Sequence, residues 1–238
     1  LTSITIPESM TRIEERAVSN CSSLEDIIFQ NSSSITYIGK SAFASCTSLT
    51  SVQIPDGLKS IEESTFSNCT NLKSVVIPFG VEKISSFAFL RCSSLTEIII
   101  PNSVTTVGKQ VFADCSNLKS VSLSDEVKTI TQSMFNGCKK LEHVALPSKL
   151  TNIRNHAFYE SYCRSMKKIC FMGDCTWIEP SAFSYCNRDF TIYYILGTNG
   201  WTDSSAYDAA AGTWNGYPLK TWDGKTIPEE TKISVPTG

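Results

Sequence analysis

The chain of 238 residues is long enough for one or two domains with a hydrophobic core. Hydrophobic residues make up 41% of it and charged residues 18%, a composition that excludes wholesale disorder. Its 21 basic and 23 acidic residues leave a net charge of −2, so nothing indicates binding to nucleic acid or to anionic lipid. No apolar run could span a membrane. No leader peptide opens the chain, and Leu1 begins directly on the first predicted strand, so we expect further sequence upstream of Leu1.

A repeat of 23 to 25 residues runs through most of the chain. Its most regular marker is a cysteine, usually with a large apolar residue three positions before it. Eight units begin at Leu1, Leu24, Leu49, Leu72, Leu95, Leu118, Leu141 and Met166. A fixed period of this length predicts a solenoid, in which each unit buries its apolar edge by stacking on its neighbours.

Each unit predicts the same short elements in the same order. Val52 and Ile54 alternate with variable residues, which predicts a half-buried strand. Proline lacks the N–H that a strand ladder needs, and it ends the predicted strand at Pro7, Pro55, Pro78, Pro101 and Pro147. Apolar residues then follow at intervals of three and five, as at Val104, Val107 and Phe112, which favours a second extended leg and a short helical turn. The fold class is therefore a solenoid with a curved parallel sheet and short helical segments on its back.

The repeat pattern ends after Cys186. Residues 190–195 predict a ninth strand, with Ile192 and Tyr194 facing inward. Tryptophans and glycines crowd residues 197–222, and a solenoid needs its last apolar face covered. We therefore expect eight repeats over residues 1–188, a strand and capping segment over 189–222, and a tail or linker over 223–238.

Eight of the ten cysteines occupy one equivalent site per unit. This spacing predicts a column of buried thiols, with disulfides between successive turns as the alternative. Cys175 falls at the core site that Leu58 occupies in its unit, whereas Cys170 falls at an outward strand position and is expected to meet solvent. A zinc site formed by Cys163, Cys170 and Cys175 has unsuitable spacing, so we expect no metal and no other cofactor.

The outward positions of the predicted strands form two columns on the concave face. Ile28, Val76 and Ile99 stand in one column where water is expected, either as filler that suits a strand or as part of a contact surface. The first column reads Ser3, Asp26, Ser51, Ser74, Glu97, Ser120, His143 and Lys168. The second reads Thr5, Ile28, Gln53, Val76, Ile99, Ser122, Ala145 and Cys170, with Tyr193 continuing it. The candidate binding residues are Ile28, Gln53, Val76, Glu97, Ile99, Ser122, His143, Cys170 and Tyr193.

Catalytic chemistry has little support in the sequence. Neither His143 nor His156 has a serine, cysteine or carboxylate at a recognisable motif spacing. The glycines form no phosphate-binding loop. We therefore expect a protein that is not an enzyme.

The unit resembles the BspA-type leucine-rich repeat. The resemblance is clearest in I-P-N-S-V at 100–104, I-G at 38–39 and A-F-A-S-C at 42–46, although Gln30, Ser124 and Met172 replace the proline. It covers residues 1–188 and implies a leucine-rich repeat solenoid. It also implies a secreted or cell-surface protein, similar to bacterial and protozoan adhesins that bind host matrix or cell-surface proteins.

Two other functions stay open at this point. The solenoid could be a structural spacer that displays another domain, or the tryptophan-rich C-terminal segment could bind glycans. The sequence leaves the oligomeric state and the identity of any partner undetermined.

Overall fold

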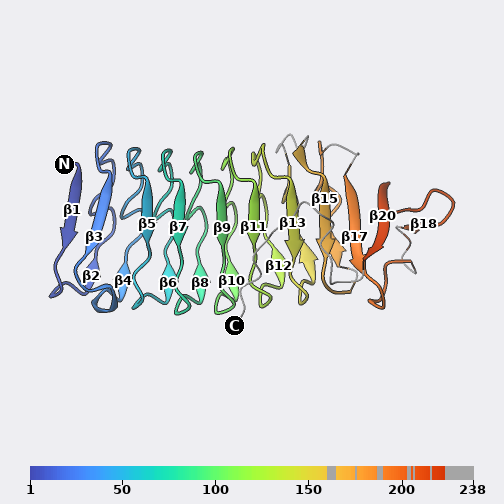
Figure 1. Ribbon diagram of the computed structural model, residues 1–238, viewed down its shortest axis with the longest axis horizontal. Helices are drawn as coiled ribbons and strands as arrows, with labels where there is room; N and C mark the ends of the chain where they lie inside the picture. Colours follow the sequence, from blue (N-terminus) through green and yellow to red (C-terminus); the bar gives the residue numbers. More distant parts are fainter. Residues whose placement is uncertain are drawn as a thin grey trace.

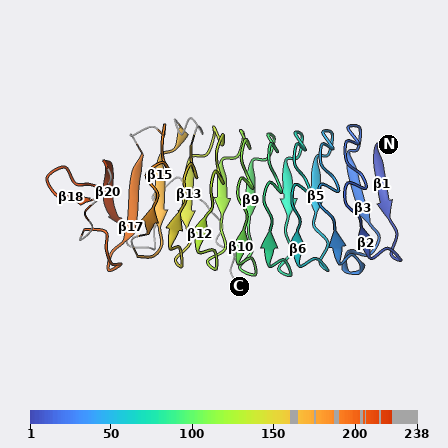
Figure 2. The ribbon, with the colours of Figure 1, turned by 180° about the vertical axis from the view of Figure 1, so that it is seen from behind.

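The computed structural model describes residues 1–159, 165–174, 176–186, 190–202, 205, 207–214 and 216–222. The chain winds into a solenoid whose turns stack in a row from the N-terminus (Figure 1). Each repeat contributes a longer strand to a first row and a shorter strand to a second row. Figure 2 shows from behind that both rows follow the length of the stack.

The first row contains one strand from each of nine turns. Alternating apolar residues such as Val52, Val75 and Ile98 point inward and are buried, which is why these segments form half-buried strands. Successive strands pair in parallel except at β3–β5 and β7–β9, where they lie side by side (Figure 1). The strands are β1 (Ser3–Ile6), β3 (Asp26–Phe29), β5 (Ser51–Gln53), β7 (Ser74–Val76), β9 (Glu97–Ile99), β11 (Ser120–Ser122), β13 (His143–Leu146), β15 (Lys168–Phe171) and β17 (Thr191–Ile195).

The second row is made of strands of two residues, one in each repeat. Their inward residues, such as Ile61 and Ile84, are buried and pair in register with the neighbouring turns. This row is the second extended leg that the sequence predicted. Its strands are β2 (Arg12–Ile13), β4 (Tyr37–Ile38), β6 (Ser60–Ile61), β8 (Lys83–Ile84), β10 (Thr106–Val107), β12 (Thr129–Ile130), β14 (Asn152–Ile153) and β16 (Trp177–Ile178).

The segment before each cysteine forms turns, although the sequence predicted a short helical turn there. Two residues of this segment have positive φ in most repeats, for example Ser41 at 54° and Ser45 at 60°. A left-handed residue interrupts the right-handed conformation that a helix requires. The N–H groups instead donate to the next turn, as from Phe43 to the carbonyl of Thr65 at 3.0 Å. The described residues contain no α-helix; a 3₁₀ turn, η1 (Ser32–Ser34), lies in the longer loop of the second repeat.

Phenylalanine rings form a continuous stack inside the solenoid. Phe43 and Phe66 have ring centroids 5.7 Å apart and planes within 4°, and the following pairs are stacked in the same way. Burial of these large rings contributes to the stability of the whole solenoid. The stack consists of Phe43, Phe66, Phe89, Phe112, Phe135, Phe158 and Phe183.

The predicted column of cysteines lies beside this stack. Its thiols donate to carbonyls of the preceding turn, as from Cys69 Sγ to Phe43 O at 3.2 Å. All eight cysteines that the structure describes are thiols. Burial raises the pKa of Cys46 to about 11 and that of Cys69 to about 12, and it also holds the pKa of Cys92 well above its ordinary value. Cys163 and Cys175, including the expected core position of Cys175, lie outside the described residues.

The C-terminal segment extends the first row and closes its end. Strand β20 (Tyr217–Trp222) pairs in parallel with β17, and β18 (Tyr207–Asp208) and β19 (Thr213–Trp214) add an antiparallel hairpin. Trp201 is buried against Phe171, with ring centroids 4.6 Å apart, and Trp214 and Trp222 are also buried. These tryptophans therefore cover the apolar end of the core. The expected tail, residues 223–238, lies outside the described residues.

The ring stack generates a prediction for stability. Replacing Phe89 by alanine removes a fully buried ring that stacks on Phe66 and Phe112, and it leaves a cavity. We expect the free energy of unfolding, measured in urea, to fall by about 3–5 kcal/mol. Phe79→Ala is the matched control, because Phe79 is 72% exposed and its loss should change stability by less than about 0.5 kcal/mol. Equal effects of the two substitutions would contradict this account of the core.

The thiol column predicts a loss of stability at alkaline pH. Burial in the folded protein raises the thiol pKa values of Cys46 and Cys69 from the ordinary value of 9.0 to about 11 and about 12. The unfolded chain therefore releases these protons first, so the stabilisation is complete below about pH 9 and declines towards the folded pKa values.

Urea unfolding at about pH 7.5 and about pH 10 measures this decline. Each buried thiol should contribute a slope approaching about 1.4 kcal/mol per pH unit above its unfolded pKa. Cys92→Ala removes one buried thiol, so the free energy of unfolding should fall less steeply with pH, by the contribution of that one thiol. An unchanged slope in this variant would show that ionisation of the thiols is not the cause.

Candidate interaction surface

The outward side chains of the first-row strands form what we call the open face. The strand register aligns equivalent residues of successive turns, as Ser51 with Ser74 and Gln53 with Val76. The two columns expected from the sequence are therefore present as two lines of side chains across the strands. Inward residues such as Val52 and Val75 fix this orientation because they are buried in the core.

Apolar side chains reach solvent in the N-terminal part of the open face. Val76 on β7 is 59% exposed, Ile28 on β3 is 51% exposed and Ile99 on β9 is 46% exposed. Val76 and Ile99 lie on adjacent strands (Figure 1), and the exposed Gln53 separates them from Ile28. The side chains thus face solvent as the sequence predicted.

Phe79 adds a larger apolar side chain that the sequence analysis missed. It follows the end of β7 by three residues and is 72% exposed. We call Ile28, Val76, Phe79 and Ile99 the apolar patch. The sequence does contain a sign of it. Phe79 directly follows Pro78, and the same corner position in other repeats carries small or polar residues such as Asp56 and Asn102.

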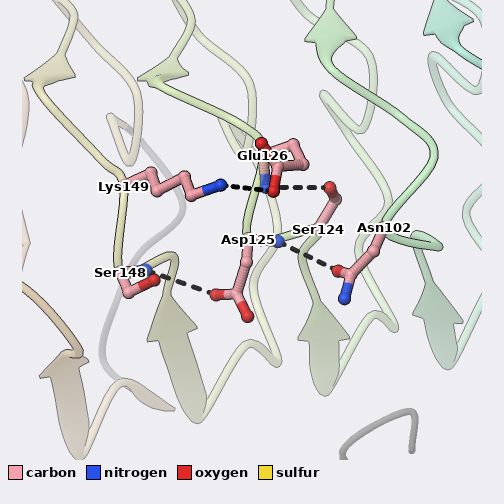
Figure 3. Close-up of polar contacts among 6 residues, drawn as sticks. All are labelled: Asn102, Ser124, Asp125, Glu126, Ser148 and Lys149. Atoms are coloured by element: carbon pink, nitrogen blue, oxygen red, sulfur yellow. Dashed lines mark hydrogen bonds and ion pairs between the residues drawn. The ribbon is translucent and has the colours of Figure 1, made fainter. Parts of the chain in front are cut away.

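Polar side chains at this corner join successive turns in several repeats. Figure 3 shows the N–H of Asp125 donating to Asn102 Oδ1 at 3.1 Å, and the N–H of Ser148 donating to Asp125 Oδ1 at 3.3 Å. Side-chain acceptors of this kind stabilise the turn backbone. The side chain of Phe79 has no acceptor for such a bond. Phenylalanine at this position therefore lacks the stabilising contact, and its ring is exposed to solvent.

In the C-terminal part of the open face, the outward side chains are much less exposed to solvent. Ser122 and Cys170 are both only 9% exposed, and the side chain of His143 is only 12% exposed. The prediction that Cys170 meets solvent is therefore wrong. Its short side chain is flanked in the register by Ala145 and the larger Tyr193, and burial raises its thiol pKa to about 11.

The nine candidate residues therefore divide into an exposed group and a buried or half-buried group, although Ser122 lies beside Ile99 in the strand register. Glu97, Ile99 and Val76 lie together on β9 and β7, with Gln53 and Ile28 continuing towards the N-terminus. On β11 and β15, Ser122 and Cys170 are buried, and on β13 and β17, His143 and Tyr193 are half-buried.

Within the described part of the chain, no group of three or more histidines, cysteines or carboxylates could hold a metal ion. No helix among the described residues is long and apolar enough to cross a membrane.

The architecture defines a class of protein, a repeat solenoid of the leucine-rich type. A family model described as "BspA type Leucine rich repeat region" matches residues 1–119 and 59–189, with six copies of the repeat. The chain therefore belongs to the BspA-type leucine-rich repeat family. This family and fold are typical of protein-interaction modules without enzymatic activity.

Solved structures of other leucine-rich repeat proteins share the fold. The protein from Bacteroides ovatus is 24% identical, with 93% of this chain and 69% of that chain covered and a TM-score of 0.63. The protein from T. pallidum is 24% identical, with 78% and 76% covered and a TM-score of 0.58. The protein from Eubacterium ventriosum is 23% identical over 79% of this chain, with a TM-score of 0.58, and this chain spans only 53% of it. The search of curated proteins found no match.

Proposed function

We propose that the chain is a non-enzymatic protein-interaction module whose apolar patch contacts a partner protein. The observation that carries this proposal is the exposure of Val76 and Ile99, which end two adjacent strands, and of Phe79 at the corner after β7. Neighbouring exposed apolar residues of this size mark contact surfaces more often than scattered single ones do.

The surroundings of the patch suit protein recognition. Glu97 shares β9 with Ile99, and Gln53 lies beside Val76, so polar groups border the apolar side chains. An apolar centre with a polar rim is the usual anatomy of a protein interface. The patch rests on paired strands, so binding requires little ordering of its backbone.

An adhesin-like role on a cell surface extends this proposal. The support is the BspA-type repeat, because the resemblance to this family implies a surface protein that binds host matrix or cell-surface proteins. Repeated turns build a long rigid face, which suits contact with a large partner. On this proposal the protein acts outside the cell and its partner is a protein.

Two other functions have weaker support. Glycan binding by the C-terminal tryptophans conflicts with the burial of Trp201, Trp214 and Trp222, which leaves none of these three rings open to a sugar. A spacer role predicts no partner for this chain, and it does not account for the exposed Val76, Phe79 and Ile99.

Lysine substitutions test the proposal directly. Immobilised protein is screened against matrix proteins and host-cell surfaces, with the double variant Val76→Lys, Ile99→Lys alongside. Burying two lysine charges at an apolar interface is costly, so we expect the affinity for any partner found to fall by at least about 100-fold.

The control variant carries the same added charge on another face. Thr106→Lys combined with Thr129→Lys places two lysines on β10 and β12 of the second row, and it should bind as the unchanged protein does. Equal losses in both double variants would indicate a general effect of charge. Binding that survives Val76→Lys, Ile99→Lys would contradict the assignment to the apolar patch, and the absence of any partner would favour the spacer.

A further inference from the structure

The eighth turn borders a hollow at the C-terminal end of the second row. The hollow has a volume of about 620 Å³ and is lined by Ile178, Glu179, Pro180, Phe183, Ser184, Tyr185, Cys186 and Tyr217. Tyr185 is 78% exposed at its rim. The hollow exists because the chain turns away after β17, and β20 then pairs with β17 in the first row. Strand β16 consequently has a partner on one side only, namely β14.

Backbone groups of the eighth turn lack the partners that their equivalents have. In each of the seven preceding turns, the N–H at the position of Phe183 donates to a carbonyl of the next turn, at 2.8–3.1 Å. The N–H at the position of Tyr185 does the same in the first five turns, at 2.6–2.8 Å. In the described part of the chain, the N–H groups of Phe183 and Tyr185 have no such partner.

An unpaired acceptor accompanies these donors. This acceptor is the carbonyl of Ile178, whose equivalent in the preceding turn is the carbonyl of Ile153. Ile153 O accepts from the N–H of Glu179 at 2.9 Å. Ile178 itself lines the hollow, and among the described residues no group donates to its carbonyl. The end of the solenoid thus presents one carbonyl and two N–H groups beside the side chains of Ile178, Phe183 and Tyr217.

The fourth turn shows what satisfies this set of groups. Ile84 O accepts from the N–H of Gly108 at 2.8 Å, and the N–H of Phe89 donates to Val111 O at 3.1 Å. The N–H of Arg91 donates to Ala113 O at 2.8 Å. A single peptide segment therefore supplies the donor and both acceptors.

We propose that the hollow of the eighth turn binds an extended peptide segment of a partner protein through main-chain hydrogen bonds. The segment adds to the end of the second row as a further turn would, with its backbone opposite Ile178, Phe183 and Tyr185. Peptide addition to an open sheet edge is an established mode of recognition, and unpaired edge groups favour it. This site is separate from the apolar patch, whose residues lie on β3, β7 and β9 of the first row and at the corner after β7.

Other ligand classes fit the hollow less well. An anion would pair with the N–H groups but not with the carbonyl of Ile178. The carboxylate of Glu179 is already held, because Arg154 Nη1 donates to it at 2.9 Å and the N–H of Asn155 donates to it at 2.6 Å. The bond from Arg154 lowers the pKa of Glu179, so this group stays an ion-paired carboxylate rather than a proton donor.

A synthetic nonapeptide copying residues 106–114 is the probe, because this segment makes the required bonds on the fourth turn. Backbone hydrogen exchange is measured by NMR on the full chain, with and without the probe. In the free protein, the amides of Phe183 and Tyr185 should exchange at least about ten-fold faster than those of Phe89 and Arg91. Saturating peptide should slow both by about ten-fold, whereas a scrambled peptide should have no effect.

A matched pair of variants places the effect in the hollow. Ser184→Trp fills part of the hollow and should abolish the protection by the peptide, and the half-buried Leu90 shows that the equivalent position accepts a bulky side chain. Ala44→Trp makes the same change on the second turn and should leave protection intact.

Three results would overturn the proposal. The first is slow exchange of Phe183 and Tyr185 in the free protein, which would mean that these groups are already paired. The second is an absence of protection by the nonapeptide, or protection that persists in Ser184→Trp. The third is protection that appears only after residues 223–238 are removed, which would assign the hollow to the chain's own C-terminal segment.

Discussion

Hydrogen bonding between successive turns is the constraint on which the whole structure depends. Parallel strands lie about 4.8 Å apart, so every residue of one turn must fit directly on its equivalent in the next. The rings of Phe43 and Phe66 and the thiols of Cys46 and Cys69 repeat because each bonds or stacks with its neighbour. Since no turn buries its own apolar edge, stability comes from the contacts between turns.

The same constraint determines where function can reside. Side chains that point inward are fixed by stacking, so variation is left to the open face, the corners and the ends of the row. The apolar patch combines outward strand residues, such as Val76 and Ile99, with a corner residue, Phe79, that gives up the usual polar contact. The hollow lies at one end of the row. There the N–H groups of Phe183 and Tyr185 lack the hydrogen bonds that the equivalent groups of earlier turns make to the next turn.

Much of the fold could be predicted from the sequence, because the repeat shows which residues occupy equivalent positions in successive turns. The spacing of the cysteines predicted the thiol column, and the alternation in segments such as Val52 to Ile54 predicted which residues face inward. The burial of Cys170 could not be predicted, because the alternation within its own unit indicates only the face on which a side chain lies and not how exposed that face is. Intervals of three and five favoured a second extended leg, which is present, and then a short helical turn, but left-handed residues such as Ser41 and Ser45 direct their N–H groups to the next turn instead. The hollow follows from the path of the chain after β17, which no local pattern encodes.

Deleting one complete turn tests the central claim most directly. Removal of residues 95–117 takes out one unit of the repeat and leaves Ser94 joined to Leu118, a residue equivalent to Leu95. If turns interact only with their neighbours in one register, the shortened protein should keep its circular dichroism per residue and unfold cooperatively at a lower urea concentration. Removal of residues 95–106 alone should abolish the single cooperative transition, since the turns before and after the junction no longer stack on each other in one register. An unfolded product from the complete deletion, or one cooperative transition from the partial one, would contradict the account.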